Sequence, residues 1–136
     1  MLNPRYKRLE IEWKHFAVGD AWCERCGYTG EALRTAIEEL RREFAPAGVM
    51  INLTETILDK TRIAESNEIR MNSILLEDIL AAGIVSTDCP SCSILAGEST
   101  CCRAIEIENE RYEDIPVGMI KQAAYRALGT VIPPKM

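Results

Sequence analysis

Apolar and polar residues alternate in two segments of the chain. The first covers residues 9–13, with leucine, isoleucine and tryptophan on one side and charged residues on the other. This period of two predicts a strand with one apolar face, and His15 falls on the same face. The second segment, residues 49–58, has the same alternation and predicts a longer strand.

A helix is predicted between these two strands. Apolar residues recur at helical spacing over residues 33–44, after Thr29 as the expected N-cap and before Pro46 and Gly48, which end the pattern. A strand, a helix of about 15 residues and a second strand form the βαβ pattern, in which the strands are parallel and the crossover is right-handed.

The second half of the chain predicts shorter elements. Residues 68–76 read as two short strands around an Asn-Ser turn, and residues 77–82 read as a short helix. Residues 104–112 alternate again and predict a strand or a hairpin. A final amphipathic helix is expected to be capped by Asp114 and to end at Gly129.

Residues 86–102 have no hydrophobic period and are rich in Ser, Thr, Gly, Pro and Cys. We therefore expect an irregular, cysteine-rich loop there. Without a linker or an internal repeat, residues 1–136 should form one domain with its core at about 9–128. The predicted class is α/β, with a central mixed sheet of about four strands, flanking helices and the cysteine-rich loop as an insertion.

Charge and composition exclude several classes of partner. The chain has a formal net charge of −5 with its acidic residues spread along it, so nucleic acid is not an expected partner. Its apolar runs are too short to span a bilayer, and the N-terminal segment lacks the apolar stretch of a secretory signal. We therefore expect a cytoplasmic protein with no membrane partner.

Two of the six cysteines form a pair between the first predicted strand and the first predicted helix. Cytosolic thiols are kept reduced, so closely spaced cysteines there are typical of metal ligands or of reactive thiols. A thiol near a helix N-terminus has a lowered pKa, and a spacing of two residues allows a disulfide to form. Cys23 is therefore the candidate attacking thiol, and Cys26 is the candidate resolving thiol.

A second pair, Cys89 and Cys92, has the same spacing. Together with Cys23 and Cys26 it would supply four thiolates to a tetrahedral zinc site, or to a softer thiophilic ion such as a heavy metal or arsenic. A local site is the other arrangement, in which the loop pair is joined by one residue of the adjacent cysteine pair that follows, with Cys102 as the candidate.

Several short motifs occur together in an order that is similar to one prokaryotic family, domain of unknown function 2703, whose members are regarded as thioredoxin-like. The resemblance covers roughly residues 9–128. The motifs are Ile11-Glu12-Trp13, the Cys23/Cys26 pair followed by Thr29-Gly30, Ser66-Asn67, Cys89/Cys92, Cys102-Arg103, and Tyr112 to Pro116.

This resemblance implies a thioredoxin-like fold. Thioredoxins place a cis-proline just before the third strand, facing the cysteine pair. In this sequence Ala64, Glu65 or Ser66 would stand there, and the segment 59–67 contains no proline.

Two hypotheses for the function follow. The first is a thiol-disulfide oxidoreductase that uses Cys23 and Cys26 on a substrate and redox partner still to be identified. The second is a noncatalytic protein that binds zinc or a soft metal ion through Cys23, Cys26, Cys89 and Cys92. Two further residues have alternative roles. His15 either polarises Cys23 or packs beside Trp13, and Arg103 pairs either a thiolate or substrate anion or, in a surface ion pair, a neighbouring glutamate.

Overall fold

The central strand β1 (Arg8–Val18) has a neighbour on each side. The computed structural model describes residues 4–18, 21–22, 24–88, 93, 97 and 101–130. Strand β3 (Met50–Leu58) runs parallel to β1, and β4 (Glu68–Met71) runs antiparallel to it on the other side. Strand β5 (Ile74–Leu75) follows β4, and the short β2 (Ala21–Trp22) pairs with the end of β1. The sheet is thus mixed, with the order β3-β1-β4-β5.

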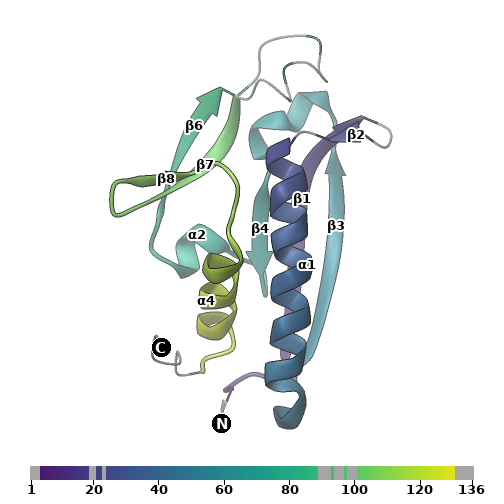
Figure 1. Cartoon of the computed structure of the whole chain (residues 1–136), viewed down its shortest axis with the longest axis vertical. Helices are drawn as coiled ribbons and strands as arrows, with labels where there is room; N and C mark the ends of the chain where they lie inside the picture. Colours follow the sequence, from purple (N-terminus) through teal and green to yellow (C-terminus); the bar gives the residue numbers. More distant parts are fainter. Residues whose placement is uncertain are drawn as a thin grey trace.

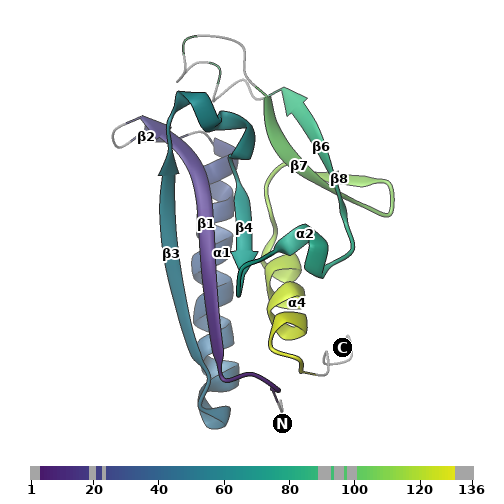
Figure 2. The ribbon, with the colours of Figure 1, turned by 180° about the vertical axis from the view of Figure 1, so that it is seen from behind.

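Two helices cover one face of this sheet. Helix α1 (Glu24–Phe44) connects β1 to β3, and the C-terminal helix α4 (Val117–Ala127) packs beside it (Figures 1 and 2). The parallel pairing of β1 and β3 confirms the predicted βαβ unit. No helix in the described part of the chain is long and apolar enough to cross a membrane.

The core lies between the sheet and these helices. The apolar face predicted for β1 is buried, and Trp13 is only 2% exposed. The predicted helical stripe over residues 33–44 is buried against it, which confirms the amphipathic pattern. Fully buried apolar residues of β1 and α1 include Leu9, Ile11, Phe16, Leu33, Ala36, Leu40 and Phe44.

A second, three-stranded antiparallel sheet follows in the chain. It consists of β6 (Gly83–Asp88), β7 (Cys101–Ile107) and β8 (Glu110–Tyr112), in that order. The prediction of an irregular loop over residues 86–102 is therefore wrong at both ends, where β6 and β7 pair. No apolar period marks these strand ends, because polar residues occupy them, as in the cross-strand pair of Ser86 and Arg103.

Helix α1 begins earlier than the sequence indicates. Thr29 was the expected N-cap, but α1 starts at Glu24 and Thr29 lies within the helix, fully buried. Its hydroxyl is used by residues outside the helix, as described below. Position 30 favours glycine within the helix, because the ring of Trp13 occupies the space that a Cβ atom would need.

Helix α4 begins later than predicted. Pro116 is its N-cap, whereas Asp114 was the expected one. The backbone before the helix is bonded to α1, because the Ile115 amide donates to the Thr29 hydroxyl at 3.1 Å. Proline also fits this position, since it needs no hydrogen-bond partner for its nitrogen.

The remaining short elements sit at turns. A 3₁₀ turn η1 (Ala45–Ala47) follows α1, a 3₁₀ segment η2 (Lys60–Glu65) precedes β4, and α2 (Leu76–Ile79) follows β5. The predicted Asn-Ser turn is confirmed, with φ of 50° at Asn72 and 71° at Ser73. Positive φ at both central residues is typical of a tight hairpin turn.

Candidate functional site

The six cysteines follow a simple arrangement along the elements. Cys23 directly precedes α1. Cys23, Cys89 and Cys92 lie outside the described residues. Cys26 belongs to the first turn of α1, and the adjacent pair Cys101-Cys102 begins β7. The side chains of these three also lie outside the described part. Among the described residues no cluster of three or more His, Cys, Asp or Glu side chains is present.

The described segments that contain or adjoin these cysteines lie at one end of the molecule. The first turn of α1, the 3₁₀ segment η2, the last residues of β6 and the first residues of β7 all lie at the upper end of Figure 1, and the reverse view agrees (Figure 2). Strand β7 contacts η2, and η2 contacts β1. In the hairpin, Asp88 is paired with Cys101 and Thr87 with Cys102.

A buried hydrogen-bond network holds the first turns of α1 against the sheet. Asn67, just before β4, donates from Nδ2 to Thr29 Oγ1 at 2.7 Å and accepts from Trp13 Nε1 at 2.9 Å. The Ile115 amide donates to the same Thr29 oxygen. Asn67 adopts a left-handed backbone with φ of 72°, which asparagine tolerates better than most residues.

The same network includes the turn that precedes β4. The backbone amide of Asn67 donates to the Lys14 carbonyl at 2.9 Å, and Ser66 Oγ accepts from the Phe16 amide at 3.0 Å. Ser66 is fully buried. The turn between η2 and β4 is thus bonded to the C-terminal half of β1, the strand that leads toward Cys23.

Sequence reasoning treated Thr29 as a helix N-cap, and it included Ser66 and Asn67 only as parts of a family pattern. It did not identify the contacts among them. One signal was available in the sequence: these small polar residues stand beside apolar segments that are expected to be buried. Burying a polar side chain is unfavourable unless it has a hydrogen-bond partner.

His15 lies in the core beside the ring of Trp13. The two rings are stacked with centroids 3.9 Å apart, and the His15 side chain is fully buried. Its Nε2 lies 2.5 Å from Glu55 Oε1 on the neighbouring strand β3. This position confirms the packing interpretation of His15.

Arg103 forms an ion pair with Glu77, the second residue of α2. Both side chains are largely buried, with exposed fractions of 16% and 5%. The pairing with a glutamate therefore agrees with the second of the two roles considered for Arg103. It links β7, directly after the adjacent cysteine pair, to α2.

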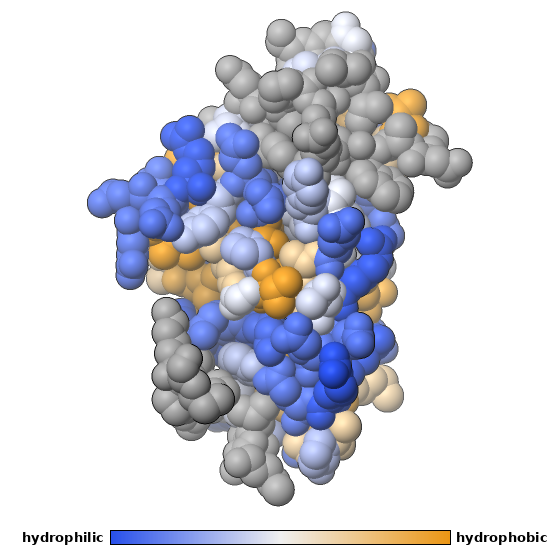
Figure 3. All heavy atoms as spheres, in the orientation of Figure 1, coloured by the Kyte–Doolittle hydropathy of each residue, from blue (hydrophilic) through white to orange (hydrophobic). Residues whose placement is uncertain are grey.

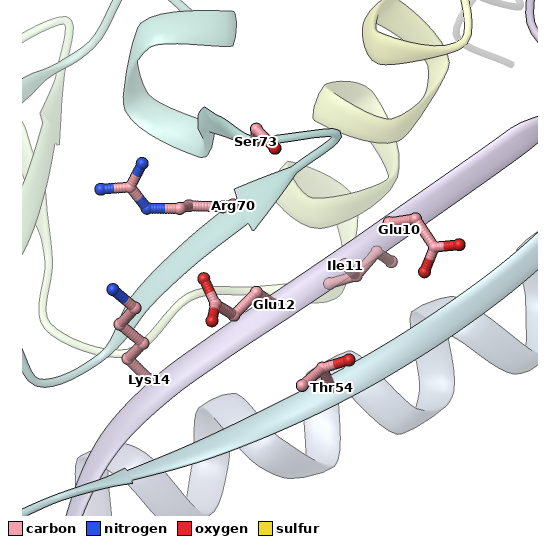
Figure 4. Close-up of a pocket in the computed structure, with 7 residues that line it drawn as sticks. All are labelled: Glu10, Ile11, Glu12, Lys14, Thr54, Arg70 and Ser73. Carbon is pink, nitrogen blue, oxygen red and sulfur yellow. The ribbon is translucent and has the colours of Figure 1, made fainter.

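The face of the sheet opposite α1 is polar and has a shallow hollow of about 550 Å³ (Figure 4). Glu12 points into it between Lys14 and Arg70. Lys14 and Arg70 both form an ion pair with Glu68, whose Oε2 lies 3.6 Å from Lys14 Nζ and 2.9 Å from Arg70 Nε. The hydrogen bond with Glu68 raises the pKa of Arg70. This hollow contains none of the predicted site residues.

The described residues therefore define an α/β protein in which the first turn of α1, the end of β6 and the start of β7 lie at one end of a mixed sheet. The chain matches the family model described as Domain of unknown function (DUF2703) over residues 9–124. An uncharacterized protein of Archaeoglobus fulgidus is 30% identical over 117 residues, which span 83% of this chain and 82% of that protein. No solved structure matches the chain. The chain belongs to the DUF2703 family, as the resemblance indicated.

Proposed function

We propose that this chain is a thioredoxin-like thiol protein in which Cys23 is the attacking thiol and Cys26 the resolving thiol. One observation carries the proposal: Cys23 directly precedes α1, and Cys26 lies in its first turn. Unpaired amide groups and the positive end of the helix dipole favour a thiolate at this position. The earlier start of α1 strengthens this reasoning, since a helix starting after Thr29 would leave the pair outside it.

The topology supports a thioredoxin-like arrangement. The order β3-β1-β4-β5, with β1 and β3 parallel and β4 and β5 each antiparallel to its neighbour, is that of a thioredoxin core. The α1 crossover and the final α4 occupy the corresponding places in the chain order. The turn Ser66-Asn67 stands before β4, where thioredoxins have their cis-proline.

The proposed chemistry is a two-step thiol-disulfide exchange. The Cys23 thiolate attacks one sulfur of a substrate disulfide, forming a mixed disulfide and releasing the first substrate thiolate. The Cys26 thiolate then attacks the Cys23 sulfur and releases the second. Two electrons pass to the substrate, the protein is left with a Cys23–Cys26 disulfide, and a dithiol reductant returns it to the starting state.

The pH dependence of alkylation tests this proposal. Metal-free protein is treated with iodoacetamide over a range of pH, and Cys23 is followed by peptide mass spectrometry. We expect Cys23 to react with a midpoint well below about pH 8 and to form a reversible disulfide with Cys26. A normal thiol midpoint, together with no Cys23–Cys26 disulfide in a dithiothreitol redox buffer, would contradict the proposal. The Cys101→Ser variant serves as the matched control.

A second function is favoured by the position of the first turn of α1, the end of β6 and the start of β7 at one end of the fold. In this proposal Cys23, Cys26, Cys89 and Cys92 hold zinc or a softer ion without catalysis, and Cys102 is the alternative fourth ligand. The chain order supports it, because β6 ends directly before Cys89 and β7 returns to the same end.

Metal analysis separates the two functions. Protein purified without chelator is analysed for metal, and the number of reactive thiols is measured before and after chelation. One tightly bound zinc per chain, with thiols that react only after its removal, supports the binding function and contradicts the redox one. Arsenite and mercuric ion are tested in the same way against a Cys23→Ser, Cys26→Ser variant, and equal binding by both proteins would exclude a role for the first pair.

A further inference from the structure

Strand β3 is an edge of the central sheet. It pairs with β1 on one side, and no other described strand pairs with its outer side (Figures 1 and 2). Two apolar side chains on its α1 side are exposed, Leu53 by 37% and Ile57 by 55%. Arg41 covers the Ile51 carbonyl, donating from Nη2 at 2.8 Å. An edge strand presents backbone N–H and C=O groups to which another strand can pair. Arg41 occupies such a group only near the start of β3.

The groove between α1 and this edge is basic. It has a volume of about 570 Å³ and is lined by Arg34, Arg41, Arg42 and Glu38 as its charged residues. Two acidic residues of α1 on its other side form ion pairs with α4, where Lys121 Nζ lies 3.1 Å from Glu39 Oε1 and 2.7 Å from Glu43 Oε2. A positive groove is thus found on a chain whose net charge is −5.

The β7–β8 hairpin has the opposite charge. Its tip and flanks carry the exposed carboxylates of Glu106, Glu108 and Glu110. The hairpin projects from the side of the molecule opposite β3, and hydrophilic side chains gather over it (Figures 1 and 3). Strand β8 is itself the outer strand of its sheet, with β7 as its described partner.

We propose that the β7–β8 hairpin of one copy docks onto the β3 edge and the basic groove of a second copy. Backbone hydrogen bonds between β8 and β3 would extend the sheet, and the hairpin carboxylates would meet Arg34 and Arg42. A symmetric pairing of two β3 edges is less favourable, because it brings the arginines of both copies together. The two surfaces lie on opposite sides, so the contact is heterologous and propagates from head to tail.

Two charge-reversal variants test this contact. The groove variant is Arg34→Glu with Arg42→Glu, and the hairpin variant is Glu108→Lys with Glu110→Lys; all four side chains are exposed. Sedimentation velocity is measured with a thiol reductant and chelator present, from about 10 µM to about 500 µM protein. For the wild-type chain we expect a mass that rises about twofold over this range in about 20 mM NaCl and stays monomeric in about 500 mM NaCl.

Each variant alone should remain monomeric, because its hairpin and groove then carry the same sign of charge. An equal mixture of the two should associate again, since each hairpin then meets a groove of opposite charge. Circular dichroism of both variants verifies that they are folded. A monomeric wild-type chain in low salt, or a mixture that stays monomeric, would overturn the proposal. A dimer unaffected by the hairpin variant would instead assign the edge to β3–β3 pairing, and binding of only an added acidic peptide would assign it to a foreign strand.

Discussion

Thr29 Oγ1 lies 2.7 Å from Asn67 Nδ2, and this contact joins the second turn of α1 to the turn before β4. The same oxygen accepts from the Ile115 amide, so one hydroxyl connects three segments that are far apart in the sequence. Thr29 is fully buried and Asn67 is 5% exposed. The position of α1 relative to the sheet thus depends on a polar contact as well as on apolar packing.

Replacing Thr29 by valine should destabilise the fold by about 3 kcal/mol. Valine has nearly the same shape but leaves two buried donors, Asn67 Nδ2 and the Ile115 amide, without their acceptor. Urea unfolding followed by circular dichroism measures the change. Thr35→Val is the control, because Thr35 is exposed on the same helix and its replacement should change the stability by less than about 0.5 kcal/mol. Equal effects of the two substitutions would contradict this role of Thr29.

Adding one methyl group at Gly30 should also destabilise the protein. An ideal Cβ at this position would lie 2.7 Å from Cη2 of Trp13, so the buried ring would have to move. Alanine is favoured over glycine in helices by about 1 kcal/mol, and this gain should be lost to overpacking. Gly118→Ala in α4 is the matched control, since no atom lies within 4 Å of its Cβ, and it should raise the unfolding temperature. An unfolding temperature for Gly30→Ala at or above the wild-type value would show that the ring adjusts freely.

The βαβ half of the fold was predictable because its apolar periods are long. Burial on one face of β1 and along one stripe of α1 produces a regular pattern over many residues. Element boundaries were less predictable. Thr29 has the sequence preference of a helix cap, but its partner Asn67 is distant in the sequence, and only the tertiary structure shows that the hydroxyl is used there.

The β7–β8 hairpin agrees with the strand or hairpin predicted over residues 104–112, but the pairing of β6 with β7 was not predictable, for a different reason. Strands β6 and β7 pair apolar residues only at their centre, as in Ile84 with Ile105, and polar residues such as Ser86 and Thr87 follow in β6. The cysteine pairs were visible from their spacing alone. The return of β7 beside β6 depends on tertiary pairing, which no local pattern indicates.

Breaking the ion pair between Glu77 and Arg103 should cost about 3 kcal/mol. Glu77→Leu leaves the mostly buried guanidinium without this carboxylate, and such single substitutions are strongly unfavourable. The double variant Glu77→Leu, Arg103→Met should recover most of the loss, because two apolar side chains replace the pair. Chemical denaturation of the single and double variants measures the coupling, with Arg111→Met on the exposed face of β8 as control. Additive losses in the double variant would show that the pair is not coupled.

Tyr125 should make the stability fall between pH 10 and pH 12. Burial and the hydrogen bond to Glu43 raise the pKa of Tyr125 to about 12. The raised pKa means that the folded state favours the protonated tyrosine. Its stabilising contribution is therefore present below the unfolded pKa near 10 and is lost as the pH rises through about 12.

The phenolate absorbance and the stability of Tyr125→Phe check this expectation. The variant should lack the last phase of the alkaline titration, whereas Tyr112→Phe should keep it. The stability advantage of the wild-type chain over Tyr125→Phe should shrink across the same range of pH. A wild-type titration that is complete well below pH 12 would contradict the shift.

The proposed redox function makes the Thr29 network important for the cysteine pair as well as for stability. Thr29 lies one turn after Cys26, so its contacts with Asn67 and Ile115 hold the part of α1 that directly follows Cys23 and contains Cys26. Loosening this turn should weaken the alignment of amide groups that favours a Cys23 thiolate. Thr29→Val should therefore move the alkylation midpoint of Cys23 to higher pH. Thr29→Ser keeps the hydroxyl and should restore the wild-type midpoint, and Thr35→Val should not move it. If Thr29→Val lowers only the unfolding temperature, the network supports the fold without influencing the thiols.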